Sequence, residues 1–176
     1  HNHQLKTGMG FIGQQASRAR AHMTTRVLAI HGAFSSPRIY SYLKLKMGRT
    51  YHWNCWDYSQ QTGGFTALLS RFPVPEVPHH VVGHSMGGIL ALSLVNQPWV
   101  LSVTTISTPL GGLDVNVFQS MMSRSDFMED LRSQGDIIRK LAATATSKPV
   151  QHLISTRGFH PWIYEANDGV VTLRSQ

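Results

Sequence analysis

The sequence has a single cysteine, few acidic residues and no long apolar run. Cys55 has no partner for an internal disulfide, which excludes a disulfide-stapled secreted scaffold and makes a reducing, cytoplasmic location the expectation. The apolar runs are too short to span a bilayer. The 9 Asp and Glu face 16 Lys and Arg, for a net charge of +7. Because three of these cations lie in the first 22 residues and the others are scattered, the charge does not favour a nucleic-acid partner.

Length and composition predict one folded domain. The chain has 176 residues, of which 41% are hydrophobic and 14% charged, enough to fill a core and too little charge for a disordered tail. Residues 1–22 contain no acid, no apolar signal-peptide segment and no periodicity. We interpret them as a leader, either an artificial extension or an organelle transit peptide, and residues 23–176 as the working domain.

Short apolar runs alternate with helical segments throughout the working domain. Strands are expected at Val27–Ile30, Tyr51–Tyr58, His79–Val82, Val100–Ile106 and Gln151–Ser155. Helices are expected at Phe65–Phe72, at Met86–Asn96 and within Asp114–Ala145. This alternation predicts an α/β fold, with a mostly parallel sheet covered by helices on both faces.

The strongest chemical signal is Gly83-His84-Ser85-Met86-Gly87, between an expected strand and an expected helix. A serine on such a turn has a strained backbone, and glycines two residues before and after it remove Cβ atoms that would clash. The following helix directs its free N–H groups and positive dipole end towards the serine. The motif therefore predicts Ser85 as a nucleophile, the alternative being an ordinary glycine-rich turn.

A second motif, His31-Gly32-Ala33-Phe34, follows the first expected strand. Acyl transfer needs two backbone N–H donors for the oxyanion, one from the residue after the nucleophile and one from a loop of this kind. The predicted donors are the N–H groups of Met86 and Ala33, with Phe34 as the alternative to Ala33.

These motifs resemble those of the α/β-hydrolase superfamily, and within it the small serine lipase and esterase branch. The matching segments are His31-Gly32, Gly83 to Gly88, Ile106-Ser107-Thr108-Pro109 and Asn167-Asp168-Gly169-Val170-Val171. The resemblance implies a hydrolase that cleaves small-molecule or lipid carboxylic esters through an acyl-enzyme on Ser85. It implies no cofactor, and the His, Cys and acidic residues have no metal-site spacing.

The resemblance also implies Asp168 as the acid of a catalytic triad, with Asp114 as its rival and a plain turn aspartate as the alternative. The family's order places the histidine after the acid, and no histidine follows Asp168 in this sequence. Four explanations stay open: a truncated chain, a C-terminal segment from another polypeptide, an earlier histidine as base, or lost catalysis. The candidate substitute base is His160, in the loop before Asp168.

Two other functions remain compatible with the motifs. A noncatalytic relative or fragment would keep the fold as a binding or assembly module, and an acyltransferase or peptidase would use the same nucleophile. The sequence also ends where the family has a last strand and helix. We therefore expect an open sheet edge beside Gln151–Ser155, and self-association or pairing with a C-terminal fragment.

Overall fold

The computed structural model describes residues 24–110 and 136–155, which form a parallel sheet flanked by helices. The strands are β1 (Thr25–Ile30), β2 (Tyr51–Trp56), β3 (His79–His84), β4 (Val100–Ile106) and β5 (Val150–Leu153). The α-helices are α2 (Ser41–Met47), α3 (Phe65–Ser70), α4 (Met86–Ser93) and α7 (Asp136–Ala143), and short 3-10 turns, η1 (Pro37–Tyr40) and η2 (Gly48–Thr50), precede and follow α2. The predicted α/β fold with helices on both faces is confirmed.

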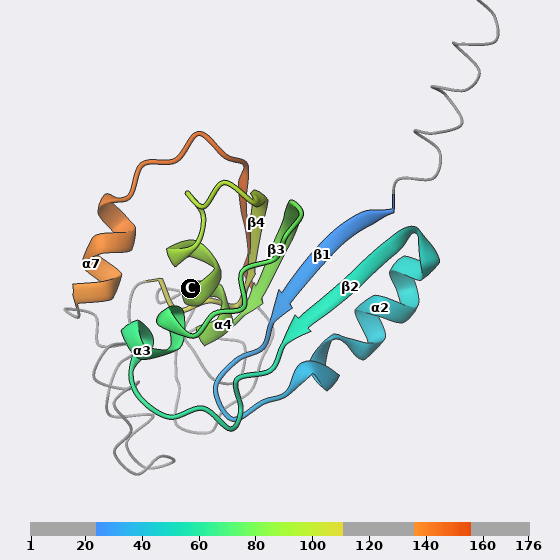
Figure 1. Cartoon of the computed structure of the whole chain (residues 1–176), viewed down its shortest axis with the longest axis horizontal. Helices are drawn as coiled ribbons and strands as arrows, with labels where there is room; N and C mark the ends of the chain where they lie inside the picture. Colours follow the sequence, from blue (N-terminus) through green and yellow to red (C-terminus); the bar gives the residue numbers. More distant parts are fainter. Residues whose placement is uncertain (1–23, 111–135, 156–176) are drawn as a thin grey trace, which may run out of the picture.

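The strand order creates a crevice at one end of the sheet. The order is β2-β1-β3-β4-β5, and every neighbouring pair is parallel. The chain leaves β1 towards β2 and then returns to form β3 on the other side of β1. Since crossovers between parallel strands are right-handed, this reversal puts α2 on one face and α4 with α7 on the other (Figure 1). The loops after β1 and β3 diverge there, which is where open α/β sheets bind ligands.

Helix α4 forms the centre of the core. It is buried from Met86 to Ala91, as expected for a helix that is apolar almost all the way round. Below it lie Leu28, Val81 and Val103, which are paired in register on neighbouring strands and so project from one face of the sheet. This packing fixes the start of α4 over the carboxyl ends of β1 and β3.

The element ends differ from the expected ones for reasons of pairing. Strand β3 continues past Val82 to His84 because it has neighbours on both sides, β1 and β4. Strand β2 stops at Trp56 rather than Tyr58 because its neighbour β1 ends opposite, at Ile30. Helix α4 ends at Ser93, before the expected Asn96. Helix α2 had no counterpart among the expected elements.

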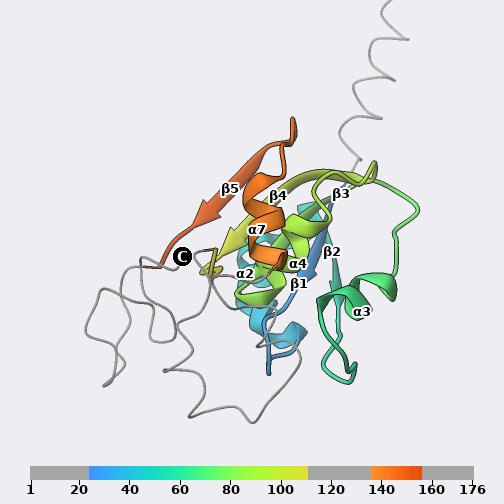
Figure 2. The ribbon, with the colours of Figure 1, turned by 90° about the vertical axis from the view of Figure 1, so that its left-hand side faces the viewer.

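Strand β5 is the outermost strand on its side of the described sheet (Figure 2). Its only partner among the described strands is β4, and Leu153 and the following Ile154 are 45% and 49% exposed. Both the expected open edge and the expected self-association stay predictions. Within residues 24–110 and 136–155, no helix is both long and apolar enough to cross a membrane.

Candidate functional site

Ser85 occupies the junction between β3 and α4 in a left-handed backbone conformation, with φ 53° and ψ −123°. Its N–H donates to the carbonyl of Ile106 at 2.9 Å, and its own carbonyl accepts from the N–H of Gly88 at 3.0 Å. A left-handed non-glycine residue costs about 1–3 kcal/mol and persists only where its surroundings hold it. These bonds to β4 and to the first turn of α4 hold Ser85 in place.

Gly83 and Gly87 let the turn that carries Ser85, here called the elbow, pack closely without space for a side chain. A Cβ on Gly83 would lie 2.3 Å from the carbonyl oxygen of Gly87, and a Cβ on Gly87 would lie 2.2 Å from that of Ile30. Both obstacles are backbone atoms, which no change of side-chain rotamer relieves. The glycines before and after Ser85 therefore have the steric role that the sequence predicts.

The loop after β1 passes against Ser85. A Cβ on Gly32 would lie only 3.1 Å from the Cβ of Ser85 and 3.3 Å from the carbonyl oxygen of His84. Ala33 follows and is half-buried, whereas Phe34 is 74% exposed with φ 54°. Ala33 directly follows Gly32, and Met86 directly follows Ser85. The two residues predicted to donate to an oxyanion therefore come next to the two residues that are in close contact.

An ionisable pair that the sequence did not predict joins the loop after β1 to the first residue after β2. His31 is 1% exposed, and its Nδ1 lies 2.8 Å from the carbonyl oxygen of Gly32 while its Nε2 lies 3.1 Å from Oδ1 of Asp57. Nδ1 donates to the Gly32 carbonyl, whereas Nε2 faces both the Asp57 carboxylate and the N–H of Tyr58, which lies 3.4 Å away. Hydrogen bonds from Ser59, and then the bond from His31, lower the pKa of Asp57.

Two tyrosine hydroxyls hold the end of β1. Tyr40 donates to the carbonyl of Ile30 at 2.8 Å, and Tyr58 donates to the carbonyl of His31 at 2.6 Å. The Tyr58 ring also stacks on the His31 ring, with centroids 4.3 Å apart. Burial raises the pKa of both tyrosines, so both hydroxyls keep their protons at neutral pH and remain donors.

A signal for this network exists in the sequence once strand order is known. Ile30 pairs with Trp56 in register, so the residues that follow β1 and β2 must emerge side by side. His31 therefore meets Asp57 and Tyr58. His31 is thus a buried, hydrogen-bonded residue of this network.

The structure describes only some of the other candidate residues. Asp168, His160 and the rival acid Asp114 fall outside the described residues. His79 is buried at the start of β3, the opposite end of the strand from Ser85. His152, in β5, lies 2.7 Å from the hydroxyl of Thr105 through its Nδ1. In the part of the chain that the structure describes, no group of three or more His, Cys, Asp or Glu side chains could hold a metal ion.

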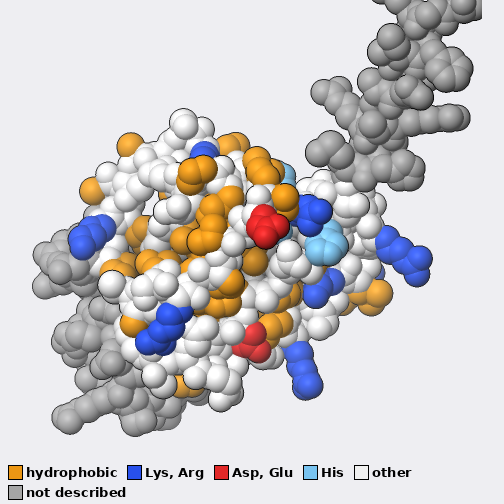
Figure 3. All heavy atoms as spheres, viewed as in Figure 1, with side chains coloured by type: hydrophobic (Ala, Val, Ile, Leu, Met, Phe, Trp, Pro, Cys, Tyr) orange, Lys and Arg blue, Asp and Glu red, His pale blue; other side chains and the backbone are white. Residues whose placement is uncertain are grey.

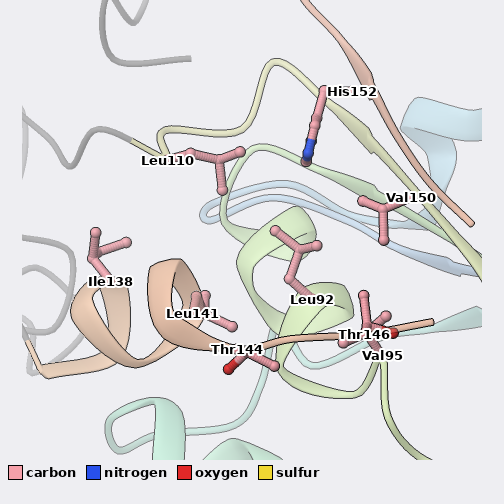
Figure 4. A pocket seen from close by; sticks show the side chains of 9 residues that line it. All are labelled: Leu92, Val95, Leu110, Ile138, Leu141, Thr144, Thr146, Val150 and His152. Atoms are coloured by element: carbon pink, nitrogen blue, oxygen red, sulfur yellow. The ribbon is translucent and has the colours of Figure 1, made fainter. Parts of the chain in front are cut away.

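An apolar cavity of about 330 Å³ lies between α4, α7 and β5 (Figure 4). Its lining consists of Leu92, Val95, Leu110, Ile138, Leu141, Thr144, Thr146, Val150 and His152. Leu92 is roughly two helical turns from Ser85 along α4. Neither Ser85 nor Gly32 is among the residues that line the cavity.

Comparison with known proteins supplies a likeness of structure. No protein-family model matches the sequence, and no curated protein matches it. The mature form of a Bacillus licheniformis lipase matches over 88% of this chain and 80% of its own, with 14% identity and a TM-score of 0.60. A deformylase from Pseudomonas putida matches over 74% of this chain and 73% of its own, with 13% identity and a TM-score of 0.51. Likeness at such low identity establishes architecture, and the chain has the fold of the α/β-hydrolase superfamily.

Proposed function

We propose that this chain is a serine hydrolase that cleaves carboxylic esters through an acyl-enzyme on Ser85. The observation that carries the proposal is the strained Ser85 at the β3–α4 junction, with the backbone of Gly32 packed against its Cβ. Backbone strain that the fold maintains at a half-buried serine is a reason to propose a function for it. The likeness to a lipase of the same fold supports the same reaction class.

In the proposed reaction, the Ser85 hydroxyl attacks the ester carbonyl carbon while a histidine removes its proton. The carbonyl oxygen becomes an oxyanion that accepts hydrogen bonds from the N–H groups of Met86 and Ala33. Collapse breaks the bond to the alcohol, which leaves with the proton from the histidine. Water then attacks the carbonyl carbon of the acyl-enzyme while the histidine removes its proton. Collapse breaks the bond to Ser85, which regains the proton from the histidine, and the carboxylic acid is released.

The start of α4 favours this charge development. Met86 is the first residue of α4, where backbone N–H groups lack helical partners and the helix dipole is positive. The tyrosine hydroxyls that bind the carbonyls of Ile30 and His31 support the second donor, because they fix the chain just before Ala33. Donors held before the reaction need no reorganisation during it.

Asp168 and His160 complete the proposal as the carboxylate and the base. His31 is a poor base for Ser85 because its two ring nitrogens face the Gly32 carbonyl and Asp57. A base must have a free nitrogen within hydrogen-bond distance of the nucleophile.

The test is covalent labelling of the full chain with a fluorophosphonate, followed by mass spectrometry of the labelled peptide. We expect the label on Ser85 and none in Ser85→Ala. The matched control is Ser107→Ala, because Ser107 also follows a strand and has a positive φ of 47°. Label on Ser107, or undiminished label in Ser85→Ala, would contradict the proposal.

A second measurement tests the base. Hydrolysis of a short-chain p-nitrophenyl ester should fall roughly 10³-fold or more in His160→Ala, as for the loss of a triad histidine. Unchanged turnover in this variant would remove His160 from the proposal and leave the Ser85 assignment to the labelling result.

A further inference from the structure

Helix α2 presents apolar side chains to solvent as well as to the sheet. Its inner side is formed by the buried Tyr40 just before it and by the half-buried Leu43 and Met47. On the opposite side, Tyr42 is 69% and Leu45 is 77% exposed. Surface helices ordinarily place polar residues there. The exposed apolar side chains of α2 therefore favour a partner that can bury them.

Cations surround these apolar residues. Residues three or four positions apart share one side of a helix. By this spacing the exposed side of α2 and its flanking turns, here named the α2 outer face, comprises Arg38, Ile39, Tyr42, Leu45, Lys46 and Arg49. The Lys46 ammonium lies 5.5 Å from the centre of the Tyr42 ring, so charge and apolar surface are in direct contact.

The charge of this region is of one sign. No Asp or Glu precedes Asp57 in the sequence, so β1, α2 and β2 carry cations without a carboxylate of their own. Lys and Arg side chains project on the side of the molecule where Figure 1 draws α2, as Figure 3 shows. A cluster of like charge attracts anionic partners over about a Debye length, roughly 10 Å at moderate salt.

We propose that the α2 outer face binds the surface of an anionic lipid bilayer. A bilayer interface takes tyrosine and leucine side chains at the boundary of headgroups and acyl chains, while lysine and arginine meet lipid phosphates. The α2 outer face is a convex stripe on one short helix, and a headgroup layer adapts to it without a matching groove. A polyanion in solution would bind the cations only, and the side chains of Tyr42 and Leu45 would remain exposed to water. A bilayer surface is therefore the better match for the whole α2 outer face. The proposal is independent of the chemistry at Ser85.

The test is sedimentation of the full chain with vesicles of phosphatidylcholine, with and without about 30% phosphatidylglycerol. We expect binding to the anionic vesicles that weakens as salt is raised. Removing two cations in Lys46→Gln/Arg49→Gln should weaken binding roughly 25-fold, since each cation near the surface contributes roughly fivefold. The apolar pair Tyr42→Ser/Leu45→Ser should weaken it roughly tenfold or more, because both side chains lose buried area.

Matched controls keep the same chemistry at another place. Val74→Ser removes an apolar side chain that is 67% exposed between α3 and β3, and Lys140→Gln removes an exposed cation of α7. Neither should change vesicle binding by more than about twofold. Because all these positions are exposed, thermal melts of the variants should match that of the parent chain.

Three results would overturn the proposal. The first is no sedimentation with anionic vesicles, and the second is an equal loss of binding in the α2 and control variants. The third is tight binding to polyglutamate together with vesicle binding that Tyr42→Ser/Leu45→Ser leaves unchanged, which would point to a free acidic partner instead. Comparing Lys46→Gln/Arg49→Gln with Lys140→Gln also distinguishes binding through α2 from binding through cations elsewhere in the chain.

Discussion

Replacing Gly87 by alanine tests how closely the first turn of α4 is held against β1. The added Cβ would lie 2.2 Å from the carbonyl oxygen of Ile30 and 2.4 Å from that of His31. Carbon and oxygen atoms in close contact are about 3.3 Å apart. Either α4 or the end of β1 must therefore move by roughly 1 Å.

Neither side of this contact can move without loss. The two carbonyls accept hydrogen bonds from Tyr40 and Tyr58, and α4 is packed into the core through Ile89 and Leu90. Overpacking costs about 1–3 kcal/mol, and loss of a buried hydrogen bond adds about 1 kcal/mol. We expect Gly87→Ala to lower the free energy of unfolding by about 2–4 kcal/mol. For a chain of this size the melting temperature should then fall by roughly 4–16 °C.

Urea unfolding followed by tryptophan fluorescence measures this change. Gly32→Ala is the matched control, because its Cβ would come no closer than 3.1 Å to its neighbours, the Cβ of Ser85 and Nδ1 and the carbonyl oxygen of His84, so that shifts of a few tenths of an ångström relieve the contacts. Its cost should stay below about 1.5 kcal/mol. The reasoning is refuted if Gly87→Ala unfolds within about 1 kcal/mol of the parent chain, or if Gly32→Ala is the less stable of the two.

Three further predictions concern pH, the tyrosine anchor and the sheet edge. The pKa of Asp57 is lowered from 3.8 in the folded chain, so its contribution to stability is present above that value and is lost as the pH falls below it. Urea unfolding between about pH 5 and pH 2.5 should show a steeper loss for the parent than for Asp57→Asn, by less than about 1 kcal/mol because this carboxylate is half-exposed; parallel curves would contradict the pairing. Tyr58→Phe leaves the His31 carbonyl without its donor and should cost about 1–3 kcal/mol in thermal melts, whereas an unchanged melt would mean that the hydroxyl contributes nothing. Light scattering should give a mass that rises with concentration and falls back in Leu153→Lys, since a lysine blunts an exposed strand edge; a chain that is monomeric at all concentrations would contradict this expectation.

The elbow around Ser85 could be predicted from the sequence because its requirements are local. Glycines at fixed spacing, an apolar run before and an apolar helix after are all read within a few residues of Ser85. The strand Val100–Ile106 was predicted with its observed ends for a similar reason, since Pro98 and Pro109 lie just outside a β-branched run. Features of this kind depend on backbone geometry that a short segment specifies by itself.

The network around His31 could not be predicted because it depends on which strands are neighbours. Asp57 and His31 are far apart in the sequence and meet only because β1 and β2 end side by side. Helix α2 was missed for a different reason. Its exposed Tyr42 and Leu45 blur the periodicity that distinguishes a buried side from a solvent side. The α2 outer face is thus also the place where the hydrophobic pattern is least informative.

The tyrosine hydroxyls that bind the carbonyls of Ile30 and His31 divide the loop after β1 into a fixed part and a replaceable part. The backbone is held by hydrogen bonds up to His31. Beyond it, the side chain of Phe34 is largely exposed to solvent, and Ser35 and Ser36 lead into the turn η1. Loop tips of this kind tolerate insertions. Longer or bulkier segments grafted between Phe34 and Pro37 would therefore alter what can approach Ser85 while leaving the path of the backbone at Gly32 unchanged, which makes this loop the natural place to engineer selectivity.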